Sequence, residues 1–224
     1  MATRLYFSND VSTITPRAGT GLWDYRNEAV YRQLIGAARA NDVAAAGTEI
    51  GPQAGSSKKY LDRGYISAPC ASSIAIVGAV KAQLFAKESN AAANEAGLWT
   101  DIYFINDAGD WDIDEGCLWL TAQNGDNGEL ATAYTNTRII NKTPQASKNL
   151  YTGVRILIQI GYSCATPYEC SAFYGSGNGS SPLTDLSGSG TETDTATYCG
   201  WVEFTETITF QSETVTRKLR GHVV

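Results

Sequence analysis

Hydrophobic and polar residues alternate with a period of two in several segments of this chain, the pattern of a half-buried β-strand. In residues 152–162, apolar side chains occupy every even-numbered position from Val154 to Tyr162, whereas Arg155 and Gln159 fall on the opposite face. The same alternation predicts strands at 201–210, 74–87, 98–105, 117–121 and 60–68, and terminal strands at 5–8 and 214–219. One polar and one apolar face is typical of strands in an antiparallel sheet.

Turn-forming residues connect these predicted strands. Gly, Asn and Asp gather at 106–109, 124–128 and 175–180. Many strands joined by such turns indicate an all-β fold, an antiparallel β-sandwich of jelly-roll-like type with long loops. Only residues 28–40 carry a weak apolar stripe at helical spacing, so at most one short helix is expected.

The stretch VKAQLFAKESNAAANEAGLW, residues 80–99, begins with strand alternation and continues with good helix formers. Residues 88–97 offer no large apolar side chain, so a helix there would gain little from packing. A strand that runs into a loop is the better interpretation.

The 224 residues suffice for one sizeable core, because a chain of this size buries about 70% of its surface on folding. We expect a single domain spanning 1–224. Residues 1–57 would form an irregular N-terminal strand or arm with the short helix, and the Gly/Ser/Thr-rich residues 175–197 an exposed loop.

Charge argues against nucleic acid as a partner, and hydropathy argues against a membrane. The net charge is −6, and Lys and Arg form no basic stripe, so nucleic acid is not expected as a partner. The first residues lack the apolar core of a signal peptide, and no apolar run is long enough to cross a bilayer. We therefore expect synthesis as a soluble protein in the cytoplasm, with no membrane partner.

The cysteine pattern encodes neither a zinc knuckle nor a dithiol motif. The five cysteines are an odd number and contain no CxxC pair. Free, buried cysteines are expected in a cytosolic product, and a later disulfide between Cys164 and either Cys170 or Cys199 stays open. The full set is Cys70, Cys117, Cys164, Cys170 and Cys199.

An acidic cluster is the one candidate for metal binding. Asp110, Asp112 and Asp114 alternate as in a calcium loop, yet Glu115 stands where an EF-hand needs its glycine and Thr121 where it needs a bidentate Glu. The alternatives are a calcium site of another kind and an acidic turn. No cofactor is expected, since the Gly-rich residues 175–179 lack the Lys and the helix of a phosphate loop.

Catalysis has little support. The single histidine, His222, lies near the end of the sequence, where a rigid catalytic triad is not expected. A pair of carboxylates could hydrolyse a glycan, but carboxylates occur on every solvated face. We predict a protein that is not an enzyme. The carboxylates available for such a pair are Asp112, Asp114, Glu203 and Glu206.

Aromatic residues are abundant enough to form a binding surface. Those within predicted strands, Trp99, Trp119 and Trp201, are expected in the core. Those near turns are candidates for exposed contact with a glycan or a protein, and sequence does not separate these. They are Trp23, Tyr25, Trp111, Tyr168 and Tyr174.

Several short motifs stand out in the first hundred residues. They are MATRLYF at 1–7, GLWD at 21–24, LDR at 61–63, ISAP at 66–69 and GAVKAQLFAKESNAAAN at 78–94. With these motifs the chain resembles a group of short, β-rich virion proteins of tailed bacteriophages, and the resemblance is looser near 201–204. It implies a non-enzymatic structural component and carries over no catalytic residue. The chain departs from the group in its cysteines and in the 175–197 loop.

Three hypotheses follow. The first is a capsid decoration or cement protein, a homo-oligomer located in the virion that binds other virion proteins, the major capsid or tail proteins. The second is a tail-fibre, baseplate or head-fibre component that binds host surface glycan. The third is a polysaccharide-degrading tail enzyme. In each, the chain is made in the host bacterial cytoplasm.

Overall fold

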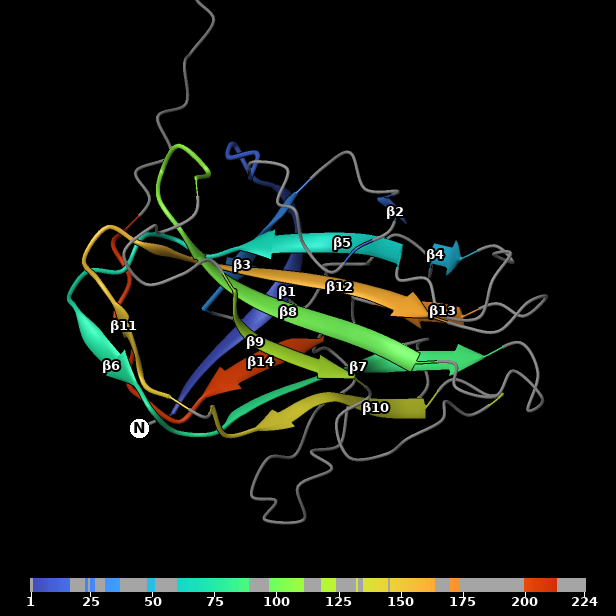
Figure 1. The fold of residues 1–224 in the computed structure, drawn as a ribbon. Coiled ribbons are helices and arrows are strands. Elements are labelled where there is room, and N and C mark those ends of the chain that lie inside the picture. The colour runs from blue at the N-terminus through green and yellow to red at the C-terminus, as the bar shows by residue number, and fades with distance from the viewer. Residues whose placement is uncertain are drawn as a thin grey trace, which may run out of the picture.

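The protein is represented by a computed structural model, and Figure 1 shows the arrangement of its chain. Within the residues that it describes, every regular element is a β-strand. The all-β fold class predicted from the alternation is therefore confirmed. The described residues are 2–16, 23, 25–26, 31–36, 48–50, 60–88, 97–110, 118–123, 132, 135–144, 146–163, 170–173 and 200–212.

The strands in chain order are β1 (Thr3–Val11), β2 (Tyr25–Arg26), β3 (Arg32–Ile35), β4 (Thr48–Ile50), β5 (Tyr60–Ile66), β6 (Ile74–Ile76), β7 (Val80–Glu88), β8 (Gly97–Ile105), β9 (Leu118–Gln123), β10 (Thr135–Lys142), β11 (Lys148–Leu150), β12 (Arg155–Ser163), β13 (Cys170–Phe173) and β14 (Trp201–Phe204). The main sheet has the order β4-β13-β7-β14-β1-β3-β5-β12-β8-β9, with β10 added to β7 and β2 to β5. Strands β6 and β11 form a separate two-stranded sheet.

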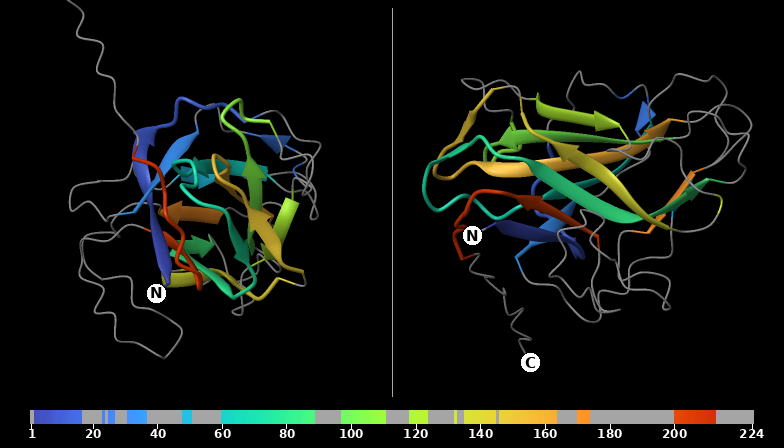
Figure 2. Two further views of the ribbon diagram at one scale, coloured as in Figure 1. Left: turned by 90° about the vertical axis from the view of Figure 1, so that its left-hand side faces the viewer. Right: turned by 90° about the horizontal axis from the view of Figure 1, so that it is seen from below.

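The main sheet curls so that its two halves face each other across one core, as in a sandwich (Figures 1 and 2). Most ladders are antiparallel, as predicted, but β2 and β3 run parallel to β5, so the sheet is mixed. The core is built from inward-facing aliphatic and aromatic side chains of strands throughout the sheet. Its members include Leu5, Phe7, Tyr65, Leu84, Phe104, Ile158 and Phe204.

Strand β7 follows the predicted alternation on its core face, with Val80, Ala82 and Leu84 buried, but Gln83 on the opposite face is buried too. The predicted strand at 74–87 is nevertheless wrong in one respect, because it is two strands separated at residues 77–79. There the Glu206 carboxylate accepts hydrogen bonds from the backbone N–H groups of Val77 and Gly78, at 2.8 and 2.6 Å. The chain turns at this clamp, so β6 pairs with β11 instead of extending β7.

The helix predicted at 28–40 is wrong where the structure describes it, since Arg32–Ile35 forms strand β3. This strand pairs with β1, where Phe7 lies opposite Leu34, and both side chains are buried. Burial of these side chains in the core outweighs a weak local preference for helix. The rest of the predicted helix, apart from Tyr31 and Gly36, lies outside the described residues.

The C-terminal strand is shorter than predicted. β14 ends at Phe204, although Ile208 is still buried and Thr205, Thr207 and Thr209 are exposed, as the predicted alternation requires. The Ile208 N–H donates to Thr3 Oγ1 at 2.6 Å, which fixes this extension to the first strand. The strand predicted at 214–219 and the exposed loop predicted at 175–197 both lie outside the described residues.

Candidate functional site

The clearest polar feature of the structure is a buried cluster on the outer face of β12. The Trp23 indole N–H donates to Gln159 Oε1 at 2.9 Å, and Gln159 Nε2 donates to the Tyr31 hydroxyl at 3.1 Å. Gln159 is 1% exposed, Trp23 8% and Tyr31 7%. The two halves of one amide therefore join two aromatic residues of the N-terminal region to the middle of the sheet.

Neighbouring strands continue this polar row. Across the sheet, Gln159 lies opposite Gly64 on β5 and Asp101 on β8, and Asp101 lies opposite Thr121 on β9. Asp101 is 1% exposed, and its Oδ2 accepts a hydrogen bond from the Tyr103 hydroxyl at 3.3 Å. The hydrogen bonds of Gln159 to Trp23 and Tyr31, and of Asp101 to Tyr103, favour one register for strands that pack on both faces.

Gly64 is required by the position of Tyr31. A Cβ atom at residue 64 would lie 2.2 Å from Tyr31 Cε1, well inside van der Waals contact. The Tyr31 ring therefore lies directly on the β5 backbone. Beside it, a second apolar cluster fills the outer face, formed by Tyr31, Ile66, Tyr103, Ile105 and Leu157.

This cluster corrects the half-buried strand predicted at 152–162. Gln159 was predicted on the polar, solvated face, but Trp23 and Tyr31 cover it, so β12 is buried on both faces. Because its groups are nearly inaccessible to water, the cluster holds the N-terminal region on the sheet and presents no reactive group to solvent.

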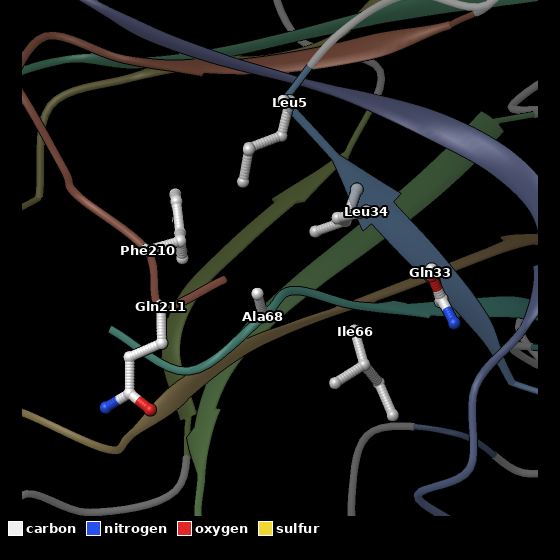
Figure 3. A pocket seen from close by; sticks show the side chains of 8 residues that line it. Leu5, Gln33, Leu34, Ile66, Ala68, Phe210 and Gln211 are labelled. Carbon is white, nitrogen blue, oxygen red and sulfur yellow. The ribbon is translucent and has the colours of Figure 1, made fainter. Parts of the chain in front are cut away.

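A pocket opens where β3 and β5 separate (Figure 3). The two strands pair only at Arg32 with Tyr65 and at Gln33 with Ile66, after which β3 continues beside β1. The resulting space has a volume of about 270 Å³. The residues that line it are Leu5, Gln33, Leu34, Gly36, Ile66, Ala68, Phe210 and Gln211.

The chemistry of this pocket is apolar. Five aliphatic or aromatic side chains form its wall, and the polar side chains are the amides of Gln33 and Gln211. Gln33 Nε2 donates to the Val11 carbonyl at 3.2 Å, and Gln211 Nε2 to the Cys70 carbonyl at 3.3 Å. None of these described lining residues is an acid, a base or a nucleophile, and the volume is below the ~300–1,000 Å³ typical of ligand sites.

The aromatic residues predicted to make exposed contacts differ in burial and position. Trp23, predicted to be exposed, is buried against Gln159, which is a correction: its indole ring covers the sheet. Tyr25 lies in β2, beside Tyr60 of β5. Trp111, Tyr168 and Tyr174 lie outside the described residues. Of the predicted core tryptophans, Trp201 is fully buried, and Trp99 is partly buried.

The predicted metal cluster can be placed only in part. The Asp110 N–H donates to Asn106 Oδ1 at 3.0 Å in the turn that follows β8. Asp112 and Asp114 lie outside the described residues. Among the residues that the structure describes, no three His, Cys, Asp or Glu side chains gather as metal ligands would.

The carboxylates considered for glycan hydrolysis have structural contacts. Glu203 Oε2 lies 2.9 Å from Arg4 Nη2, and the Arg4 guanidinium stacks 3.8 Å from the centroid of the Trp201 ring. Glu206 Oε1 is the clamp on Val77 and Gly78. The Arg4 contacts join β1 to β14, whereas Glu206 joins the segment after β14 to the turn between β6 and β7. His222 lies outside the described residues.

Cys70 is a free, buried cysteine, as predicted. Its Sγ donates to the Ser72 carbonyl at 2.9 Å. Burial raises the pKa of the Cys70 thiol, and the Ser72 backbone lowers it by less. The thiol is therefore held in its protonated, unreactive form. The side chains of the other four cysteines lie outside the described residues, so the disulfides left open stay a prediction.

Comparison with known proteins identifies no family. No family model matches the chain, and no curated protein matches it. Among solved structures, an aminopeptidase from a marine sediment Thaumarchaeota archaeon is similar with a TM-score of 0.39 and 15% identity, over 63% of this chain and 25% of that one. A structure of infectious bursal disease virus, Gt strain, is similar with a TM-score of 0.33 and 13% identity. This likeness covers 86% of this chain and 38% of that one.

The Gx strain of the same virus gives a TM-score of 0.26 and 11% identity, over 85% of this chain and 41% of that one. The chain thus spans well under half of each of these structures. Likenesses at such TM-scores carry no argument about function. In the described part of the chain, no helix is long and apolar enough to cross a membrane.

Proposed function

We propose that this chain is a non-enzymatic structural protein of a tailed-bacteriophage particle, and that it acts there as a capsid decoration or cement protein. It would bind the major capsid protein or other virion proteins as a homo-oligomer. The binding free energy of such contacts stabilises an assembled lattice, because a partner that binds only the assembled state shifts the equilibrium towards it.

The observation that carries this proposal is where the resembling residues lie. Of these residues, 3–7, 80–88 and 201–204 lie in β1, β7 and β14, which are adjacent strands of the main sheet. Gly78 in the same motif lies against Thr205, where a Cβ atom would be 2.6 Å from Thr205 Cβ. The residues that carry the resemblance therefore belong to the packed strands of the sheet. Strands of this kind support a protein that acts by binding through its surface.

Contacts between segments that are distant in sequence hold this framework together. The Arg4–Glu203 ion pair and the Arg4–Trp201 stack join β1 to β14, and Glu206 joins the segment after β14 to Val77 and Gly78. Mild acidity, with a pI near 4.8, keeps separate copies soluble before assembly.

The test is a cryo-EM reconstruction of intact particles in which copies of this chain are counted against the major capsid protein. A copy number that follows the capsid lattice, with a lower melting temperature for particles that lack the chain, supports the proposal. Absence of the chain from particles contradicts it, and so does unchanged thermal and osmotic stability of particles without it.

A small copy number set by tail symmetry would instead favour the adhesion hypothesis, in which the chain binds host surface glycan. That hypothesis has lost one of its aromatic candidates, since Trp23 is buried and hydrogen-bonded. It then predicts that purified protein adheres to host cells and that substitution of Trp111 or Tyr174 abolishes adhesion. Release of reducing sugar from host envelope would point to the enzyme hypothesis.

A further inference from the structure

The chain continues beyond β14 as residues 205–212, which we call the strap. It crosses the end of the molecule that faces the viewer in Figure 2 (left), where it is drawn in red as the continuation of β14. Ile208 is 5% exposed, and Phe210 packs partly buried against the core. The strap therefore closes this end of the sandwich.

The far end of the strap is attached through a short backbone ladder. The Ala71 N–H donates to the Thr209 carbonyl at 2.8 Å. The Gln211 N–H donates to the Pro69 carbonyl, also at 2.8 Å. This ladder joins the strap to the segment that follows β5.

Phe210 covers the buried thiol of Cys70. The two residues lie opposite each other in an antiparallel bridge, which places their side chains on the same face of the pair. Cys70 is 0% exposed, and Phe210 packs against the core cluster to which Cys70 belongs. A reagent reaches this thiol when the strap moves away.

The start of the strap is attached by side chains, in addition to the Glu206 clamp. Thr3 Oγ1 donates to the Glu206 carbonyl at 2.8 Å and accepts from the Ile208 N–H at 2.6 Å. Thr205 Oγ1 donates to the Ala79 carbonyl at 2.7 Å. These bonds are exposed or only partly buried. Water can therefore replace each of them when the strap leaves.

Two features lower the stability of the closed strap. The Glu206 Oε2 atom is buried and accepts no hydrogen bond from the described residues, although Oε1 accepts two. A buried carboxylate oxygen without a donor costs free energy that exposure to water recovers. Phe210 also lines the pocket between β3 and β5, so its ring lacks packing partners on that side.

We infer that the strap detaches as one unit while the main sheet stays folded. Detachment breaks the ladder to residues 69–71 and the side-chain bonds at the start of the strap, but no pairing between two strands of the main sheet. Segments held mainly by exposed hydrogen bonds open at a lower free energy than the whole fold. Opening uncovers Cys70 and widens the pocket beside it.

Alkylation of Cys70 measures this opening in the full chain. Tryptic residues 64–81 form one peptide in which Cys70 is the single cysteine, so mass spectrometry follows its labelling separately from the other four. Hydrogen exchange of the Ile158 N–H on β12 measures opening of the whole fold. We expect the open fraction from Cys70 labelling, taken relative to the unfolded chain, to exceed that from Ile158 exchange by at least about tenfold.

Three Thr→Val substitutions form a graded series, because valine keeps the shape of threonine and lacks its hydroxyl. Thr3→Val removes two bonds of the strap, and Thr205→Val removes one. Thr13→Val makes the same change at an exposed residue outside the strap and is the matched control. We expect labelling of Cys70 to accelerate at least about tenfold in the first variant, less in the second and not in the control. Circular dichroism and thermal melting confirm that each variant is folded.

A fourth substitution separates strap opening from unfolding of the whole molecule. Ile102 on β8 is buried in the core and stays packed when the strap opens. Ile102→Val should accelerate Ile158 exchange several-fold and leave Cys70 labelling unchanged. Labelling of Cys70 that follows Ile158 exchange in the wild type and in Ile102→Val overturns the inference. Equal labelling rates in Thr3→Val and Thr13→Val overturn it too.

This inference goes beyond the proposed function and does not rest on it. The measurement needs no phage particle. The strap can open in a chain that is absent from particles, and a decoration protein can bind the capsid with its strap closed. The two proposals can therefore fail separately.

Discussion

At the scale of single residues, the contact between Tyr31 and Gly64 is the most restrictive one. We expect Gly64→Ala to destabilise the protein by about 1–3 kcal/mol, because the new methyl group overlaps the Tyr31 ring. Urea denaturation measures the loss. In a Tyr31→Ala background the overlap is gone, so adding Gly64→Ala should cost much less. An equal cost in both backgrounds would show that the ring does not lie where the structure places it.

Gln159 shows what could be predicted at this scale and what could not. Alternation correctly placed Gln159 on the opposite face to Ile158. It could not reveal that this face is covered, because the covering residues Trp23 and Tyr31 are 136 and 128 positions away along the chain. One signal was present: the unbroken apolar run at 102–105 is typical of a strand buried on both faces.

Cys70 gives a prediction of pH dependence. Burial raises the pKa of its thiol in the folded state, so the unfolded chain ionises first as the pH rises. The contribution of this pKa difference to the free energy of unfolding is therefore fully present below the ordinary thiol pKa of about 8.5. It is lost as the pH rises above that value. We expect the difference in unfolding free energy between wild type and Cys70→Ala to shrink from pH 7 to pH 10. Denaturant titrations at each pH check this, and a difference that grows with pH would contradict it.

At the scale of elements, the Glu206 clamp determines where β6 ends and β7 begins. Glu206→Ala leaves the Val77 and Gly78 N–H groups without their acceptor, which should cost about 1.5–3 kcal/mol, discounted for partial exposure. Glu206→Gln keeps an oxygen at this position and should cost less. Amide hydrogen exchange of Val77 and Gly78 should accelerate in Glu206→Ala, while exchange within β12 stays unchanged. Equal acceleration in both strands would indicate general loosening instead of a local clamp.

The errors in predicting elements have a common cause. The strand predicted at 74–87 is broken by Glu206, and the helix predicted at 28–40 becomes β3 through pairing with β1. In each case a partner distant in sequence decides the local conformation. Strands β8 and β12, which lie inside the sheet and pair with a neighbour on each side, agree with the predicted strands to within a few residues.

At the scale of the whole molecule, the sequence predicted an all-β fold with a large core, but not the order of its strands. Closure of the sheet depends on contacts such as that between Thr3 Oγ1 and the Glu206 carbonyl, 203 positions apart. Composition and alternation carry no information on such pairs. The buried cluster around Gln159 was missed for the same reason, because it combines segments that are adjacent only after folding.

The prediction of a single domain is testable through cooperativity. Leu5 on β1 and Ile158 on β12 are buried in the same core, although they lie 153 positions apart along the chain. If one core unfolds as a unit, Leu5→Ala and Ile158→Ala should each lower the stability by about 2–5 kcal/mol and shift one common transition. Tryptophan fluorescence and circular dichroism should report the same midpoint in each variant. Val11→Ala, at a residue 59% exposed, is the control and should change little. Two transitions, of which each substitution moves only one, would divide the core into independent units and refute the single domain.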